Sequence, residues 1–227
     1  MTPPSLLRRY LAWSADAALV CAVTLALARH PLAAALAGCS QAFDGLTTVM
    51  VSLMARLLDA GAPVQAMLAW LGSPELQAAT TALASAITRL TLLAMAVFTA
   101  VAFVWFSAFE ASPWQATPGK RWLGLKVTMR DGSRAALRSV ALRNAAGLLS
   151  WLLLNIGHLM AARGPRYQAL HDRLSGTRVV QSGSGGLPPA AWLWLWLQPA
   201  AACLLFALLV RELDARMAAA IAGAPGF

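Results

Sequence analysis

Charged side chains are scarce in this sequence of 227 residues. Asp, Glu, Lys and Arg make up 12% of it, about half of the ~25% usual in a soluble domain. Hydrophobic residues make up 59%, and the mean hydropathy is +0.63. So few charges cannot cover a surface that faces water, so lipid must replace water around much of the chain. This composition excludes a wholly soluble protein and predicts an integral membrane protein.

Cysteine and histidine are scarce too, with three residues of each. Cys21 and Cys203 lie inside apolar runs, and only Cys39 lies outside them. The sequence has no Cys-x-x-Cys pair, and the histidines lack ligand spacing, so no disulfide framework and no metal site are expected. Lys120 follows Pro-Gly but lacks the upstream glycine and the next Ser or Thr of a phosphate loop. Without a nucleophile motif either, we expect neither an enzyme nor a cofactor.

Long apolar runs are what the sequence does have. Four of them are similar in length to the ~20 residues that a helix needs to cross ~30 Å of hydrocarbon. They are residues 11–28, 87–109, 141–162 and 190–210. The predicted fold class is an all-α transmembrane bundle of about four hydrophobic helices, with a small cytoplasmic β-hairpin-like element. Whether 141–162 spans fully or re-enters on the same side is left open by the charges around it, and so is the side of the C-terminus.

The charges present are mostly positive, 18 Lys and Arg against 9 Asp and Glu, for a net charge of +9. A nucleic-acid surface or cytoplasmic loops would each explain such an excess. The basic residues flank the apolar runs, which favours loops and no nucleic-acid partner. The most basic segment, residues 110–140, is therefore predicted to be cytoplasmic.

The stretch LAGCS at Leu36–Ser40 looks like a lipoprotein cleavage site that would place Cys39 at the mature N-terminus. A signal sequence needs an apolar stretch of only ~7–15 residues after its basic start. The stretch here is much longer, and it is interrupted by Asp16 and by residues 29–31. We therefore expect the first run to remain as a helix.

Between the first two runs, residues 38–84 are predicted to form two or three short amphipathic helices lying on the bilayer. Leu46–Leu58 is helix-like and ends before Asp-Ala-Gly-Ala-Pro, a good stop signal. Ser73 is a candidate N-cap with Pro74 at the first helical position. From there a helix can continue into the second run.

The basic loop contains signals for turns and strands. Thr117-Pro118-Gly119 is predicted to break the preceding helix. Leu123–Met129 is typical of a short strand, followed by a turn at Asp131-Gly132. Gly176–Val180 is a second β-branched segment that can pair with the first. Residues 181–189 then form a linker to a C-terminal helix and tail, 190–227.

One carboxylate stands inside the first apolar run. Asp16 lies about 10 Å along the helix axis from Arg9, too far for a direct bond between straight backbones. A charge deep in lipid costs at least ~2.5–3.5 kcal/mol, so it usually faces protein or water and finds a partner. A third group from another helix is the natural partner for either residue, and Arg9 is the nearest candidate for Asp16. An ionisable residue inside a span is by default a functional hypothesis.

The third run carries polar and small residues at helical spacing, namely Asn144, Gly147, Trp151, Asn155 and His158. Such a face is typical of a helix–helix interface or a hydrated pathway, and structural hydrogen bonding is the commoner case. His171 and Asp172 follow this run.

Several motifs in order resemble the RDD family of small bacterial membrane proteins, which is named for one arginine and two aspartates. They are RRYLAWSAD, TPGKRWLGLKV followed by DG, then LRN, and finally QALHDRLSGTRVV. The resemblance covers about Arg8 to Val180. It implies that the named residues are Arg9, Asp16 and Asp172, and Lys120, Gly124 and Arg143 match further positions. This chain departs from the family in its long segment between the first two spans and in its additional, tryptophan-rich fourth run.

The resemblance implies a multi-pass protein of the bacterial inner membrane. Transport, including cation/proton exchange, is suggested for some members, and others look like accessory components of membrane complexes. We therefore expect a transport-related role with Asp16 as the titrating group in an Arg/Asp/Asp cluster. The alternative is an assembly or scaffold protein in which the same cluster is structural. The expected partners are membrane lipid and a second copy or another membrane protein.

Overall fold

The computed structural model describes residues 3–58, 68, 70, 72–152, 168–182 and 185–223. The chain divides into two compact units. Unit 1 comprises residues 1–27 and 97–198, and unit 2 comprises residues 28–96 and 199–227. Each unit is described by itself.

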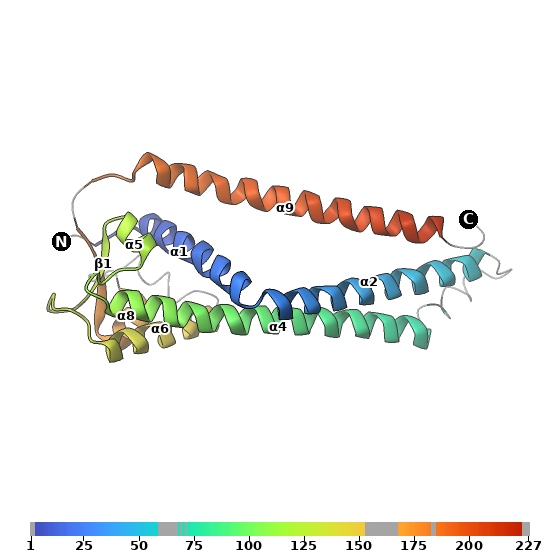
Figure 1. Cartoon of the computed structure of the whole chain (residues 1–227), viewed down its shortest axis with the longest axis horizontal. Coiled ribbons are helices and arrows are strands. Elements are labelled where there is room, and N and C mark those ends of the chain that lie inside the picture. The colour runs from blue at the N-terminus through green and yellow to red at the C-terminus, as the bar shows by residue number, and fades with distance from the viewer. Residues whose placement is uncertain are drawn as a thin grey trace. The chain divides into compact units, whose positions relative to one another are not determined.

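Three helices in the described part of the chain are long and apolar enough to cross a membrane (Figure 1). They are α1 (Leu6–Leu27), α4 (Pro74–Ala111) and α9 (Pro189–Ala222). At 1.5 Å per residue, the 38 residues of α4 reach about 57 Å, well beyond the ~30 Å of hydrocarbon. The all-α class is confirmed. The predicted span 141–162 begins in α6 (Leu137–Leu152), and the rest of it lies outside the described residues.

In unit 2, α2 (Arg29–Leu58) is one helix of 30 residues, so the prediction of short helices in 38–84 is wrong for this part. No proline interrupts the chain between Pro31 and the end of α2. Gly38 and Gly45 lower helix propensity without ending the helix. The start of α4 is confirmed, because the Leu76 N–H donates to the Ser73 hydroxyl oxygen at 3.2 Å.

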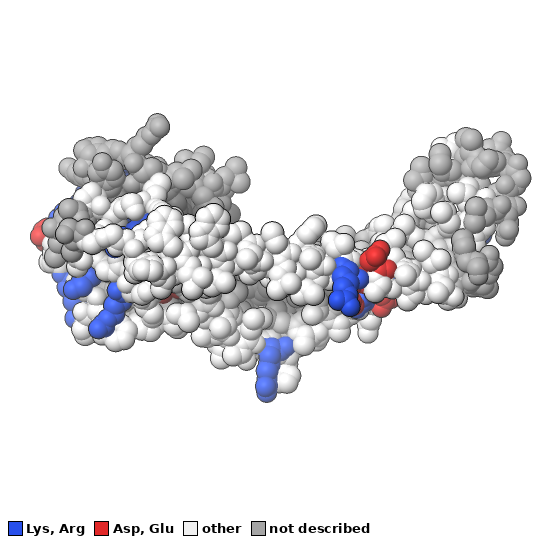
Figure 2. Space-filling model, turned by 90° about the horizontal axis from the view of Figure 1, so that it is seen from above, with Lys and Arg blue, Asp and Glu red and all other residues white. Residues whose placement is uncertain are grey.

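The predicted pairing of two short strands in unit 1 is confirmed. Strand β1 (Leu125–Met129) runs antiparallel to β2 (Thr177–Gln181), with Val127 opposite Val179. The inward faces of both strands pack against Leu11 and Ala12 of α1. A small apolar core therefore attaches the sheet to the first helix. In Figure 2, Lys and Arg side chains gather on the end of unit 1 where the sheet lies.

The prediction that Thr117-Pro118-Gly119 breaks the preceding helix is wrong. These residues begin a further helix, α5 (Pro118–Trp122). Thr117 is the N-cap, with its side chain accepting a hydrogen bond from the Lys120 N–H, and Pro118 takes the first helical position, where no N–H is needed. The preceding helix has already stopped at Ala111. A last short helix, α8 (Leu170–Ser175), ends at Gly176, whose φ of 70° is left-handed and favours glycine.

Candidate functional site: a buried charge network

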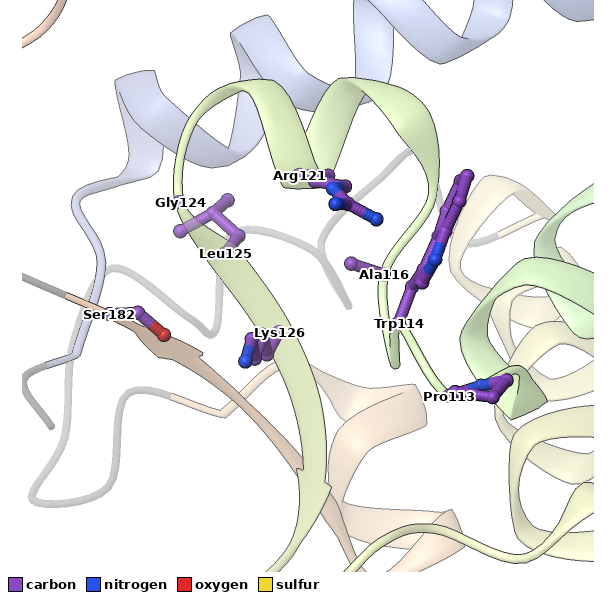
Figure 3. A pocket seen from close by; sticks show the side chains of 8 residues that line it. All are labelled: Pro113, Trp114, Ala116, Arg121, Gly124, Leu125, Lys126 and Ser182. Carbon is purple, nitrogen blue, oxygen red and sulfur yellow. The ribbon is translucent and has the colours of Figure 1, made fainter.

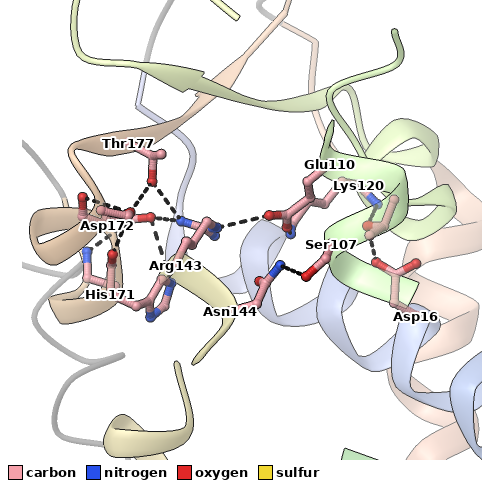
Figure 4. A network of polar contacts seen from close by, with 12 residues as sticks. Asp16, Ser107, Glu110, Lys120, Arg143, Asn144, His171, Asp172 and Thr177 are labelled. Carbon is pink, nitrogen blue, oxygen red and sulfur yellow. Dashed lines mark hydrogen bonds and ion pairs between the residues drawn. The ribbon is translucent and has the colours of Figure 1, made fainter. Parts of the chain in front are cut away.

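Six buried or largely buried ionisable side chains in unit 1 form what we call the charge network (Figure 4). Three are positive and three are negative. They come from α1, α4, α5, α6 and α8: Arg9, Asp16, Glu110, Lys120, Arg143 and Asp172. The three carboxylates are fully buried. Burying a charge is costly unless it is paired and hydrogen-bonded, so the partners of each carboxylate decide what the network can do.

Asp172 lies in the first turn of α8 and binds two arginines. One carboxylate oxygen accepts from Arg9 at 3.2 Å and from the Ala169 N–H at 3.0 Å. The other oxygen accepts from Arg143. The His171 ring nitrogen Nε2 lies 3.7 Å from the same carboxylate. Asp172 therefore connects the start of α1 with α6.

Glu110 occupies the centre of the network, in the last turn of α4. Its Oε2 accepts from the Nε of Arg143 at 3.1 Å, and its Oε1 accepts from the Lys120 ammonium. Burial lowers the pKa of Lys120 below its ordinary value, while the charge of Glu110 acts in the opposite direction. Arg143 contacts Glu110 on one side and Asp172 on the other, so it joins α4 to α8.

Asp16 is held by the N-terminus of α5. Its Oδ1 accepts from the Gly119 N–H at 2.8 Å, and its Oδ2 accepts from the Thr117 hydroxyl. The two helices approach so closely that a Cβ added to Gly119 would lie 2.3 Å from the Ala12 carbonyl oxygen. The carboxylate is thus stabilised by main-chain and hydroxyl donors, with the Lys120 charge nearby.

The separation of Arg9 and Asp16 along the helix was predicted to be too long for a direct bond, and the structure records none between these two residues. Arg9 pairs with Asp172, and Asp16 accepts hydrogen bonds from Thr117 and Gly119 at the start of α5. The expectation of a third group from another element is confirmed for both residues. Asn144 donates to Ser107 of α4 at 3.2 Å, as an interface residue would. Asn155 and His158 lie outside the described residues.

Glu110, Thr117 and Gly119 were missed by reasoning from the sequence. Glu110 directly follows an apolar run and resembles an ordinary boundary residue. It does carry a signal, because a carboxylate in the last turn of a helix is at the end where the helix dipole disfavours negative charge. Among the described residues, no group of three His, Cys, Asp or Glu side chains is placed to hold a metal ion.

The fold and the network define a class: a helical membrane protein whose first helix is attached to a small α/β module by buried ion pairs. The model of the RDD family matches residues 3–176, and the chain belongs to that family. It is similar to the "Uncharacterized protein YxaI" of Bacillus subtilis (strain 168), 35% identical over 86 residues. That match covers 38% of this chain and 56% of the relative, so the chain spans just over half the length of the relative it matches. No solved structure matches.

Proposed function

We propose that this protein is a non-catalytic scaffold or assembly component of a membrane protein complex. In this proposal the charge network fixes the α5–hairpin module, residues 118–129 and 170–181, against α1. The single observation that carries the proposal is that both oxygens of each buried carboxylate already accept hydrogen bonds or ion pairs from protein groups.

The charge balance of the network supports the same proposal. The six named side chains are three positive and three negative, so their formal charges balance within the described part of the chain. Removing one member of a buried pair is strongly destabilising, because it leaves an uncompensated charge. A network of this kind therefore specifies one arrangement of the elements that contribute to it. A module held rigidly at the membrane is suited to presenting a surface to another membrane protein or a second copy.

The variant Asp16→Asn tests the scaffold proposal. Asparagine has the same shape, but its NH₂ group donates and does not accept, so it cannot replace the carboxylate oxygen that accepts from either the Thr117 hydroxyl or the Gly119 N–H. We expect less folded protein in membranes and a lower free energy of unfolding in detergent. Asp214→Asn, at an exposed position of α9, is the matched control and is expected to be neutral. Equal stability of the two variants would contradict the proposal.

A transport role, with cation/proton exchange at Asp16, is the second proposal. The observation that favours it is the series of ion-paired groups Lys120, Glu110, Arg143 and Asp172. Asp16 is held next to this series by hydrogen bonds from Thr117 and Gly119, and chains of ionisable groups carry protons in membrane pumps. Its test is flux across proteoliposomes under a pH gradient, normalised to folded protein. Loss of flux in a stably folded Asp16→Asn variant would support transport and overturn the scaffold proposal. An Asp16→Asn variant with the same flux as the unmodified protein would contradict the transport proposal.

A further inference from the structure

A second feature of unit 1 lies outside the charge network. It is a cavity of about 280 Å³ between α5, the start of β1 and the chain that connects α4 to α5 (Figure 3). The residues that matter for its chemistry are Pro113, Trp114, Arg121, Leu125, Lys126 and Ser182. None of these side chains belongs to the charge network.

The lining of this cavity is positively charged. Arg121 and Lys126 are both exposed, and no Asp or Glu lines the cavity. Within the described part of the chain, neither cation forms an ion pair with a carboxylate. The contrast with the preceding residue is informative, because Lys120 is buried and paired with Glu110. Two adjacent basic residues thus serve different purposes: one completes the network and the other faces the cavity.

Arg121 is held in position by an aromatic ring. The guanidinium carbon lies 4.4 Å from the centre of the Trp114 ring, within the range of a cation–π contact. A guanidinium fixed in this way presents its N–H groups with less loss of conformational entropy on binding. Trp114 is 47% exposed, so the stacked pair is open to a ligand.

The wall that carries Trp114 has an unusual backbone. Gln115 has a φ of 52°, and it is the one non-glycine residue with positive φ among those described. Its carbonyl oxygen accepts from the Val127 N–H at 2.7 Å, which ties this conformation to β1. Strained residues persist where the surrounding structure requires them, and they cluster at ligand sites. The strain here places Trp114 opposite Arg121.

The cavity lies close along the chain to the C-terminal end of a candidate membrane span. Trp114 follows the end of α4 at Ala111 by three residues, and α4 is one of the candidate spans. Tryptophan is enriched at the level of the lipid headgroups. Pro113, Trp114 and Leu125 give the cavity an apolar side for glycerol or acyl carbons.

We propose that this cavity binds a phosphate group, supplied by the headgroup of an anionic phospholipid or by free phosphate. Arg121 donates to the phosphate oxygens, the Ser182 hydroxyl donates to a further oxygen, and Lys126 contributes a second positive charge. Arginine geometry suits bidentate recognition of phosphate, and basic residues near a membrane attract anionic lipid.

The test measures binding of short-chain phosphatidylglycerol, short-chain phosphatidylcholine and inorganic phosphate to the full-length protein in detergent, by native mass spectrometry. The double variant Arg121→Gln with Lys126→Gln is expected to weaken phosphatidylglycerol binding about thirtyfold. Arg138→Gln with Arg173→Gln removes the same charge from exposed positions that do not line the cavity, and should bind as the unmodified protein does.

The ligand arms distinguish the two sources of phosphate. Phosphatidylglycerol binding that depends on Arg121 and Lys126, with no saturable phosphate binding, supports a lipid site. Inorganic phosphate binding with the same dependence supports a free-phosphate site. The proposal is overturned if both double variants lose binding equally, or if phosphatidylcholine binds as tightly as phosphatidylglycerol. Both pairs of substituted side chains are exposed, and a circular dichroism melt checks that each variant is folded.

Discussion

At the scale of single residues, Gly119 decides how closely α1 and α5 approach. A Cβ at this position would lie 2.3 Å from the Ala12 carbonyl oxygen and 2.9 Å from the Asp16 carboxyl carbon. One of these neighbours is main chain, so the clash cannot be relieved by a side-chain rotation. We predict that Gly119→Ala lowers the free energy of unfolding in detergent by about 1–3 kcal/mol, the usual cost of overpacking.

Gly147 in α6 is the matched control for this substitution. Nothing lies within 4 Å of an added Cβ at this position, and alanine is the better helix former. Gly147→Ala is therefore expected to leave stability unchanged or to raise it by up to about 1 kcal/mol. Two variants of equal stability would show that α1 and α5 are not in close contact at Gly119.

Glu110 gives a second prediction at this scale. The substitution Glu110→Gln leaves Lys120 without its partner and Arg143 with only one of its two carboxylates. Breaking a buried pair in this way costs about 3–5 kcal/mol, so we expect the variant to unfold at a lower denaturant concentration. The measurement is the free energy of unfolding by denaturant in detergent.

A double-mutant cycle separates pairing from packing. Lys120→Met removes the ammonium and keeps most of the side-chain volume, so Glu110→Gln combined with Lys120→Met should be less destabilised than the two single effects added together. The coupling between neighbours in one network is expected to be about 0.5–3 kcal/mol. Strict additivity would contradict an ion pair between these residues.

At the scale of elements, the hairpin was predictable and α5 was not. Alternation in Leu123–Met129 and the β-branched residues of Gly176–Val180 indicated two strands, because strand patterning is local. In Thr117-Pro118-Gly119 the same residue types serve as helix breakers or as a helix start, and the sequence alone does not distinguish them. What decides is tertiary: Asp16 accepts from the Gly119 N–H and the Thr117 hydroxyl.

The turn after β1 gives a prediction that depends on pH. The Asp131 carboxylate accepts from the Ser133 hydroxyl at 2.6 Å and from the Ser133 N–H at 2.8 Å. These bonds lower the pKa of Asp131 below its ordinary value. A carboxyl group whose pKa is lower in the folded state stabilises that state above its unfolded pKa and stops doing so as the pH falls through the lowered value.

We therefore predict that Ser133→Ala raises the Asp131 pKa toward its ordinary value, because the hydroxyl donor is lost and only the main-chain donor remains. The measurement is an NMR titration of the Asp131 side-chain carboxyl carbon in detergent micelles. The control variant is Ser52→Ala, at an exposed position of α2, which leaves both donors to Asp131 in place. An Asp131 pKa unaffected by Ser133→Ala would show that the turn does not form as described.

At the scale of the whole molecule, the sequence predicted a membrane protein and its family, while the network partners came from the fold. Composition and the length of apolar runs are averaged over many residues, so they predict a membrane protein without any knowledge of the tertiary contacts. Pairing of Arg9 with Asp172 joins residues far apart in the chain, and nothing local indicates it. Family resemblance named the arginine and both aspartates but not Glu110, which connects them through Lys120 and Arg143.

The same contacts set the topology of the first helix. Arg8 donates to the Leu123 carbonyl oxygen at 3.0 Å, and Arg9 pairs with Asp172 at 3.2 Å. The start of α1 and the α5–hairpin module must therefore lie on one side of the membrane. Because this part of the chain is rich in basic residues, we predict that the side is cytoplasmic. The 22 residues of α1 reach about 33 Å, the length of a candidate span, so we predict that its C-terminal end emerges on the other side.

Cysteine labelling tests this topology in a background where Cys21, Cys39 and Cys203 are alanine. We predict that Pro3→Cys and Arg138→Cys react with a membrane-impermeant maleimide only in inverted membrane vesicles. His30→Cys is expected to react only in spheroplasts. The first two positions are held on one face because Arg9 of α1 and Arg143 of α6 both pair with Asp172, so they cannot be labelled from opposite sides unless those contacts are absent. Labelling of Pro3→Cys and Arg138→Cys from different sides would therefore contradict the charge network itself, whatever the function of the protein.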